Sequence, residues 1–187
     1  MLKSGSRFVA ITSGPIQKRR SGSALIVGVV GKDGSIEGIL SSRIRTDGTD
    51  STRKIIKMVE DSRFRDQIRI IALNGIALAG LNVVDIPMLE KKLRVRAVVI
   101  TRDRPRPAKL LLALGTFSRL RKNDVSKRVQ IVEDQAKIKP VRITGLYMQS
   151  TLEPHDARTF APMIYDATRL SHLIASGVSK GESAGRV

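Results

Sequence analysis

The 187-residue chain contains no cysteine and no tryptophan, and aromatic residues make up only 3% of it. The absence of cysteine excludes disulfides, thiolate zinc sites, iron–sulfur clusters and cysteine nucleophiles. With only four Phe and two Tyr, the core must be built from aliphatic side chains. The same scarcity argues against binding of single-stranded nucleic acid on a platform of stacked aromatic rings.

Long apolar runs are also missing. None approaches the roughly 20 residues that a membrane-spanning helix requires, and residues 1–7 are not followed by the apolar segment of a signal peptide. The hydrophobic content of 41% and the charged content of 27% lie in the range of globular proteins. We therefore expect a soluble, cytoplasmic protein, with no membrane partner, in which residues 1–187 form a single domain.

Acidic residues are the third scarcity. The 17 Asp and Glu residues face 34 Lys and Arg residues, which gives a formal net charge of +17. A compact domain of this length has a radius of gyration of roughly 16 Å, so this charge repels itself strongly and a bound polyanion would relieve the repulsion. A merely basic, solvated surface is the alternative. At this excess of charge, nucleic acid is the favoured partner.

The order of apolar segments predicts the fold class. Short β-branched runs predict strands at 7–11, 24–30, 36–44, 68–73, 95–101 and 141–147. Helical spacing predicts a first helix that begins near Asp50 or Ser51, and further helices at 82–93, 108–117 and 123–137, from Pro154 and from Thr168. A three-strand meander followed by β-α-β units and additional C-terminal helices is an α/β plan with a mixed sheet, as in ribonuclease H-like proteins.

Five sequence blocks, in the same order along almost the whole chain, resemble one archaeal family. They lie at residues 8–15, 47–52, 64–69, 74–85 and 172–177 with 181–183, and the block at 74–85 is the most specific. The family is endonuclease dU, which is related to endonuclease V. The resemblance implies a ribonuclease H-like fold, phosphodiester cleavage with divalent metal ions, and a site at the ends of the first and central strands.

Two of these blocks depart from the family pattern at its acids. Where the pattern has Ile-Asp-Asp-Gly-Pro, this chain has Thr12 and Ser13 in place of the two aspartates, and where the pattern has Asp-Gly, it has Asn74. Mg²⁺ is held by carboxylates together with phosphate oxygens and water, and these three side chains offer only neutral oxygens. We therefore expect no catalytic residues, no metal and no cofactor, with Mg²⁺ implied only if the chain is an active nuclease.

Four other acids are residual catalytic candidates: Asp47, Asp50, Asp85 and Glu182. Each also has an ordinary structural explanation. Asp47 is the first residue of a turn, Asp50 is a helix cap, Asp85 belongs to the first turn of a helix, and Glu182 lies in a solvated tail. A site rebuilt from Asp47, Asp50 and Asp85 remains an alternative.

Three basic groups are candidates for phosphate contacts, although each alone could be a solvated loop. They are Lys18, Arg19 and Arg20; Arg102, Arg104 and Arg106; and Arg119, Arg121 and Lys122. Lys127 and Arg128 could extend the third group into a basic helix face. The sequence thus predicts a non-catalytic nucleic-acid-binding protein, with RNA, including ribosomal RNA, favoured over DNA, in a ribosome or another ribonucleoprotein. The alternatives are an active metal-dependent endonuclease on DNA or RNA, and an architectural DNA-binding protein.

Overall fold

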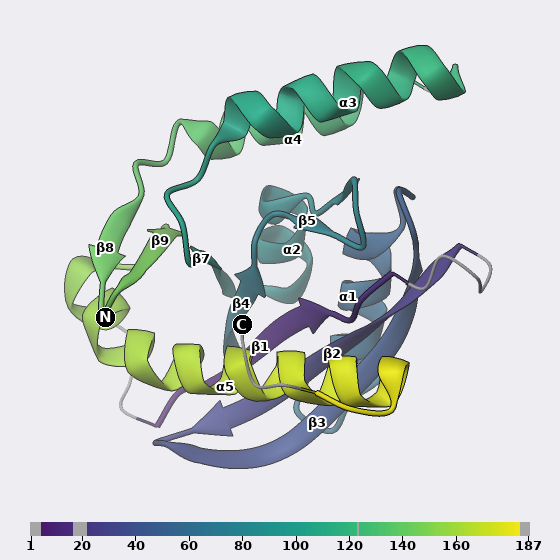
Figure 1. Ribbon diagram of the computed structural model, residues 1–187. Coiled ribbons are helices and arrows are strands. Elements are labelled where there is room, and N and C mark those ends of the chain that lie inside the picture. The colour runs from purple at the N-terminus through teal and green to yellow at the C-terminus, as the bar shows by residue number, and fades with distance from the viewer. Residues whose placement is uncertain (1–4, 17–21, 123, 184–187) are drawn as a thin grey trace.

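A computed structural model describes residues 5–16, 22–122 and 124–183. Its centre is a seven-stranded mixed sheet with the strand order β3-β2-β1-β4-β7-β9-β8 (Figure 1). The strands of this sheet are β1 (Arg7–Ser13), β2 (Ser23–Lys32), β3 (Ser35–Arg45), β4 (Ile68–Asn74), β7 (Arg96–Thr101), β8 (Val141–Ile143) and β9 (Leu146–Ser150). The helices are α1 (Ser51–Glu60), α2 (Ile86–Leu93), α3 (Pro107–Arg121), α4 (Ser126–Ala136) and α5 (Pro154–Lys180). The predicted α/β fold with a mixed sheet is confirmed.

The first three strands form the predicted antiparallel meander. The β2–β3 hairpin turns at Asp33 and Gly34, whose φ angles are 49° and 80°. Positive φ at both positions is the conformation that matches the twist of a hairpin, and an Asp-Gly pair adopts it readily.

Strands β1, β4 and β7 run parallel, so their carboxyl ends meet at one edge of the sheet. In the register, Ile11 of β1 lies beside Leu73 of β4, and Leu73 lies beside Val99 of β7. This edge is the place where residues from distant parts of the sequence come together.

Helices cover both faces of the sheet (Figure 1). On one face, Val9, Ile11 and Leu73 pack in a cluster that includes side chains of α1 and α2. On the other face, Phe8, Ala10 and their neighbours pack against Phe160, Ile164 and Ala167 of α5. Alternate residues of β1 therefore serve two cores, as the two-residue period of a strand requires. Within the described ranges, no helix is both long and apolar enough to cross a membrane.

Three predicted elements differ from the structure. Residues 82–93 are not one helix, because Asn82–Val83 is the short strand β6, paired with β5 (Ala77–Leu78), and α2 begins only after Asp85. The segment 141–147 is a hairpin, because Thr144 and Gly145 adopt positive φ between β8 and β9. The two predicted C-terminal helices are the single helix α5. Pro162 does not end α5. It is exposed, so water can donate to the backbone carbonyl that proline, which has no N–H, leaves without a donor.

Candidate functional site

The carboxyl edge of the parallel strands brings together Thr12 and Ser13 of β1, Asn74 of β4 and Arg102, which follows β7. Thr12 and Asn74 follow a registered pair, Ile11 and Leu73, so they lie side by side on adjacent strands. Asn74 and Arg102 line one small cavity. The positions at which the sequence resemblance places a catalytic site are thus neighbours in space.

The two hydroxyl side chains of β1 are engaged in structural bonds. Thr12 is buried, and its Oγ1 lies 3.0 Å from Oγ of Ser171 on α5. Because the Ser171 hydroxyl donates its only hydrogen to the carbonyl of Val27, at 2.6 Å, the Thr12 hydroxyl is the donor to Ser171. Ser13 Oγ accepts a hydrogen bond from the N–H of Ala79 at 3.1 Å. These side chains join β1 to α5 and to the loop before β6.

This edge does not fit a magnesium ion. The side chains of Thr12, Ser13 and Asn74 carry no charge that could offset a dication. Among the residues that the structure describes, no group of three or more His, Cys, Asp or Glu side chains lies close enough to hold a metal ion. No metal-dependent step can be derived from these residues.

Two of the residual acids hold the turn between β3 and α1. Asp50 occupies the N-cap position of α1, yet its side chain does not cap the helix, so this part of the prediction is wrong. Its Oδ1 instead accepts bonds from the Arg45 N–H and from Nδ2 of the buried Asn82. Asp47 has a φ of 55°, and its Oδ1 accepts the N–H of Leu81 at 2.9 Å. A Cβ atom at Gly80 would lie 2.2 Å from this oxygen, so only glycine fits there.

The other two acids lie at helix ends. Asp85 is the N-cap of α2, and its Oδ1 accepts the N–H of Met88 at 3.0 Å, while Lys127 approaches its carboxylate at 3.5 Å. Glu182 is exposed after the end of α5. The structure therefore gives Asp47, Asp50 and Asp85 defined bonds within the fold.

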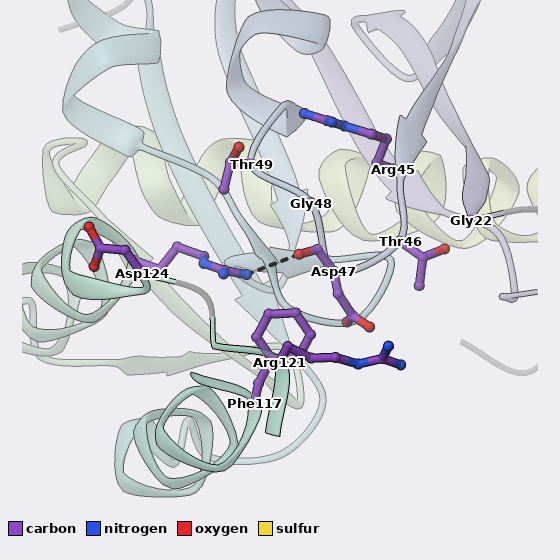
Figure 2. A pocket seen from close by; sticks show the side chains of 10 residues that line it. Gly22, Arg45, Thr46, Asp47, Gly48, Thr49, Phe117, Arg121 and Asp124 are labelled. Carbon is purple, nitrogen blue, oxygen red and sulfur yellow. Dashed lines mark hydrogen bonds between the residues drawn. The ribbon is translucent and has the colours of Figure 1, made fainter. Parts of the chain in front are cut away.

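A cleft of about 630 Å³ lies beside this acidic turn, between it and the α3–α4 hairpin (Figure 2). Asp47 lines it on one side, and Phe117 and Asp124 line it on the other. Arg128 also lines the cleft; it is 5% exposed, and its Nη1 donates to the carbonyls of Asp47 and Leu81 at 3.0 and 3.1 Å. Figure 2 marks the bond to Asp47. Arg128 therefore ties α4 to the core, and the prediction that it could extend a surface-exposed basic face is wrong.

The electrostatics of Arg128 follow from this burial. Burial lowers the pKa of its guanidinium, whereas the nearby carboxylates of Asp47 and Asp124 act in the opposite direction. An arginine stays charged in either case. The guanidinium also lies 5.1 Å from the centre of the Phe117 ring, which is within reach of a cation–π contact.

Replacing Arg128 by methionine should lower the free energy of unfolding by about 2–3 kcal/mol, because two carbonyl groups would lose their donor. Denaturant unfolding measures this change. The neighbouring variant Lys127→Met is the control. Lys127 is exposed and pairs with Asp85 at 3.5 Å, so its loss should cost less than about 1 kcal/mol. Equal stability of the two variants would contradict the tethering role of Arg128.

The predicted phosphate-contact residues fall into three places. Lys18, Arg19 and Arg20 lie outside the described residues. Arg102, Arg104 and Arg106 are exposed in the link between β7 and α3, and Arg119, Arg121 and Lys122 are exposed where α3 ends. Arg106 precedes α3 and Arg119 lies in its last turn, so the last two groups are roughly 20 Å apart, at about 1.5 Å per residue. Arg121 also lines the cleft.

Sequence reasoning missed two residues at the strand edge. Tyr165 and Thr168 of α5 line the same small cavity as Asn74 and Arg102. Their spacing of three residues places them on one helix face, which is the only signal in the sequence. Nothing in the sequence says that this face covers the ends of β4 and β7.

The fold is that of endonuclease V. Human endonuclease V has the same architecture, with a TM-score of 0.53 over 89% of this chain and 81% of that chain, at 10% identity. The chain belongs to the endonuclease dU family, whose sequence model matches residues 4–179. The family resemblance predicted from the sequence is thereby confirmed.

Archaeal relatives support the assignment. A UPF0215 protein of Methanothermobacter thermautotrophicus is 35% identical over 193 residues, covering 98% of this chain and 93% of the relative. A UPF0215 protein of Archaeoglobus fulgidus is 36% identical over 168 residues, covering 86% and 89%. The crystal structure of a protein of unknown function from Archaeoglobus fulgidus aligns with a TM-score of 0.77 at 32% identity, covering 92% of this chain and 97% of that one.

Proposed function

We propose that this protein is a non-catalytic member of the endonuclease dU family that binds RNA in the cytoplasm, as a component of a ribosome or another ribonucleoprotein. The observation that carries the proposal is the composition of the carboxyl edge. Thr12, Ser13 and Asn74 are neutral where the family resemblance implies acids, and Thr12 and Ser13 are held in hydrogen bonds that serve the fold.

The charge of the chain supports the same reading. A carboxylate cluster without metal repels phosphate, so neutral side chains make this edge more hospitable to a nucleic-acid backbone. The net charge of +17 adds a general attraction. Each phosphate that Lys or Arg neutralises releases counterions, which gives strong, salt-dependent binding with little base specificity.

The placement of the arginines favours a large, folded RNA. The groups at 102–106 and 119–122 lie at opposite ends of α3, roughly 20 Å apart by its rise per residue. Contacts so far apart can reach separate stretches of backbone, as in a protein embedded in folded RNA. A single groove would require a more continuous basic stripe.

An active metal-dependent endonuclease is the second candidate, because the family to which the chain belongs is named as an endonuclease. It would need Asp47, Asp50 and Asp85 as its acids. The bonds that these side chains make to Leu81, Asn82 and Met88 count against this assignment.

In the presence of Mg²⁺ or Mn²⁺, the protein should bind structured RNA without cleaving it. It should also leave normal and deaminated DNA uncleaved, because the carboxyl edge offers a metal no charged ligand. Gel assays of binding and cleavage on the same labelled strands measure both properties. Turnover that Asp85→Asn or Glu182→Gln abolishes, in a variant that circular dichroism shows to be folded, would overturn the proposal. Glu182 is exposed, so its variant tests catalysis without endangering the fold.

A further inference from the structure

A small cavity of about 50 Å³ lies at the carboxyl ends of β4 and β7, where α5 crosses them. Five polar residues line it: Asn74, Thr101, Arg102, Tyr165 and Thr168. Ile100 and Leu146 also line it. This space exceeds the roughly 10–15 Å³ that one water molecule needs, and the described residues that line it include no carboxylate.

Of these polar residues, only Thr101 has a hydrogen-bonded side chain among the described residues: its hydroxyl donates to the carbonyl of Asp103 at 2.8 Å. Thr168 is 1% exposed, and its buried hydroxyl has no hydrogen-bond partner within the described part of the chain. Among the described residues, no hydrogen bond or ion pair engages the side chains of Asn74, Arg102 or Tyr165. A buried donor without a partner costs about 1–3 kcal/mol, so a water molecule or an anionic oxygen that accepts the hydrogen of Thr168 would stabilise this site.

The chemistry of these four groups selects the ligand. An amide N–H₂, two hydroxyls and a guanidinium can all donate hydrogen bonds, and the guanidinium adds a positive charge suited to a planar or tetrahedral oxyanion. The same charge repels a metal ion. We propose that this cavity binds one phosphate group, beside the strand ends at which the family resemblance implies a metal. The phosphate is that of the RNA backbone if the proposed function holds, and free inorganic phosphate offers the same chemistry.

The first test is a titration of the ¹⁵N-labelled protein with inorganic phosphate, monitored by nuclear magnetic resonance. The side-chain amide of Asn74 should shift in a saturable manner. Arg102→Gln should weaken phosphate binding about tenfold, because a charge-assisted hydrogen bond is lost. Arg96→Gln is the matched control, since Arg96 is exposed at the opposite end of the same strand, β7. Equal binding by the two variants would overturn the proposal.

The variant Thr168→Val separates a binding role from a structural one. It removes the hydroxyl and keeps the shape of the side chain. Without phosphate, its melting temperature should rise, because a buried unpartnered polar atom is gone. Added phosphate should raise the melting temperature of the wild type more than that of the variant. An equal phosphate-dependent rise in both proteins would contradict a role for Thr168 in binding.

Further titrations identify the source of the phosphate. A short RNA that displaces phosphate from the Asn74 resonance assigns the cavity to a backbone phosphate. If RNA binds without displacing phosphate, the RNA uses other arginines and the cavity is a site for the free ion. If RNA does not bind while phosphate does, the proposed function fails and the oxyanion site stands. Broadening of the Asn74 signal by Mn²⁺ at low concentration, with no response to phosphate, would identify a metal site and overturn the inference.

Discussion

Replacing Arg102, Arg104 and Arg106 together by glutamine should weaken RNA binding about 100-fold at roughly 0.1 M salt. On single strands, each phosphate contact adds about 0.7 to the slope with which log K falls against log salt. At roughly 0.1 M salt, this slope corresponds to a factor of about five in the binding constant for each contact. All three side chains are exposed in the link between β7 and α3. The slope of log K against log salt should fall by about two, as filter binding over a range of salt would show.

A charge-matched control keeps this result specific. Lys91, Lys92 and Arg96 are also exposed, and they lie near the start of β7, at the opposite edge of the sheet from Arg102. Their replacement by glutamine removes the same charge. A loss of affinity as large as that of the Arg102, Arg104 and Arg106 variant would mean that only net charge matters, which would contradict an interface at the carboxyl edge.

The same variant bears on the proposed ribonucleoprotein. The wild type should co-sediment with ribosomal subunits or another ribonucleoprotein particle through moderate salt, and the Arg102, Arg104 and Arg106 variant should move to the free fraction. A wild type that is found only free would count heavily against the proposal.

The affinities for duplex DNA and for structured RNA, measured at several salt concentrations, separate RNA binding from architectural DNA binding.

Local sequence patterns predict much of this fold, because they act over a few residues. The β2–β3 hairpin follows from Asp33 and Gly34, and the buried strands follow from runs such as Ile70 to Leu73. The neutral edge also follows, because parallel strands place Thr12 and Asn74 together once the order of elements is known.

Side chains that act across long sequence distances could not be predicted in this way. Arg128 lies in a charged helix that has the composition of a solvated face, yet it is buried against carbonyl groups 81 and 47 residues away. Thr168 lies in a helix whose register against β4 is set by packing. Charge and helical spacing predict the helix or strand to which a residue belongs. They do not predict which residue, distant in the sequence, its side chain will contact.

Asn82 is the strongest case of such a long-range role, and its replacement by alanine should cost about 4–5 kcal/mol of unfolding free energy. Asn82 is fully buried. Its Oδ1 accepts the N–H of Ser51, the first residue of α1, at 3.0 Å, and its Nδ2 donates to the Arg45 carbonyl and to Asp50 Oδ1, each at 2.8 Å. The alanine variant would leave all three groups short of a partner. Since domains are stable by about 5–15 kcal/mol in total, the loss should be plain in chemical denaturation.

Asn74→Ala is the matched control, because Asn74 is only partly buried and its side chain makes no hydrogen bond with another described residue. It should cost less than about 1 kcal/mol. The two asparagines thus separate two kinds of role. Asn82 caps α1 from a distance of 31 residues and holds Asp50 in place, so Asp50 is fixed by the architecture of the turn. If Asn82→Ala were as stable as Asn74→Ala, Asp50 would be free of this constraint, and the case for a rebuilt catalytic site would strengthen.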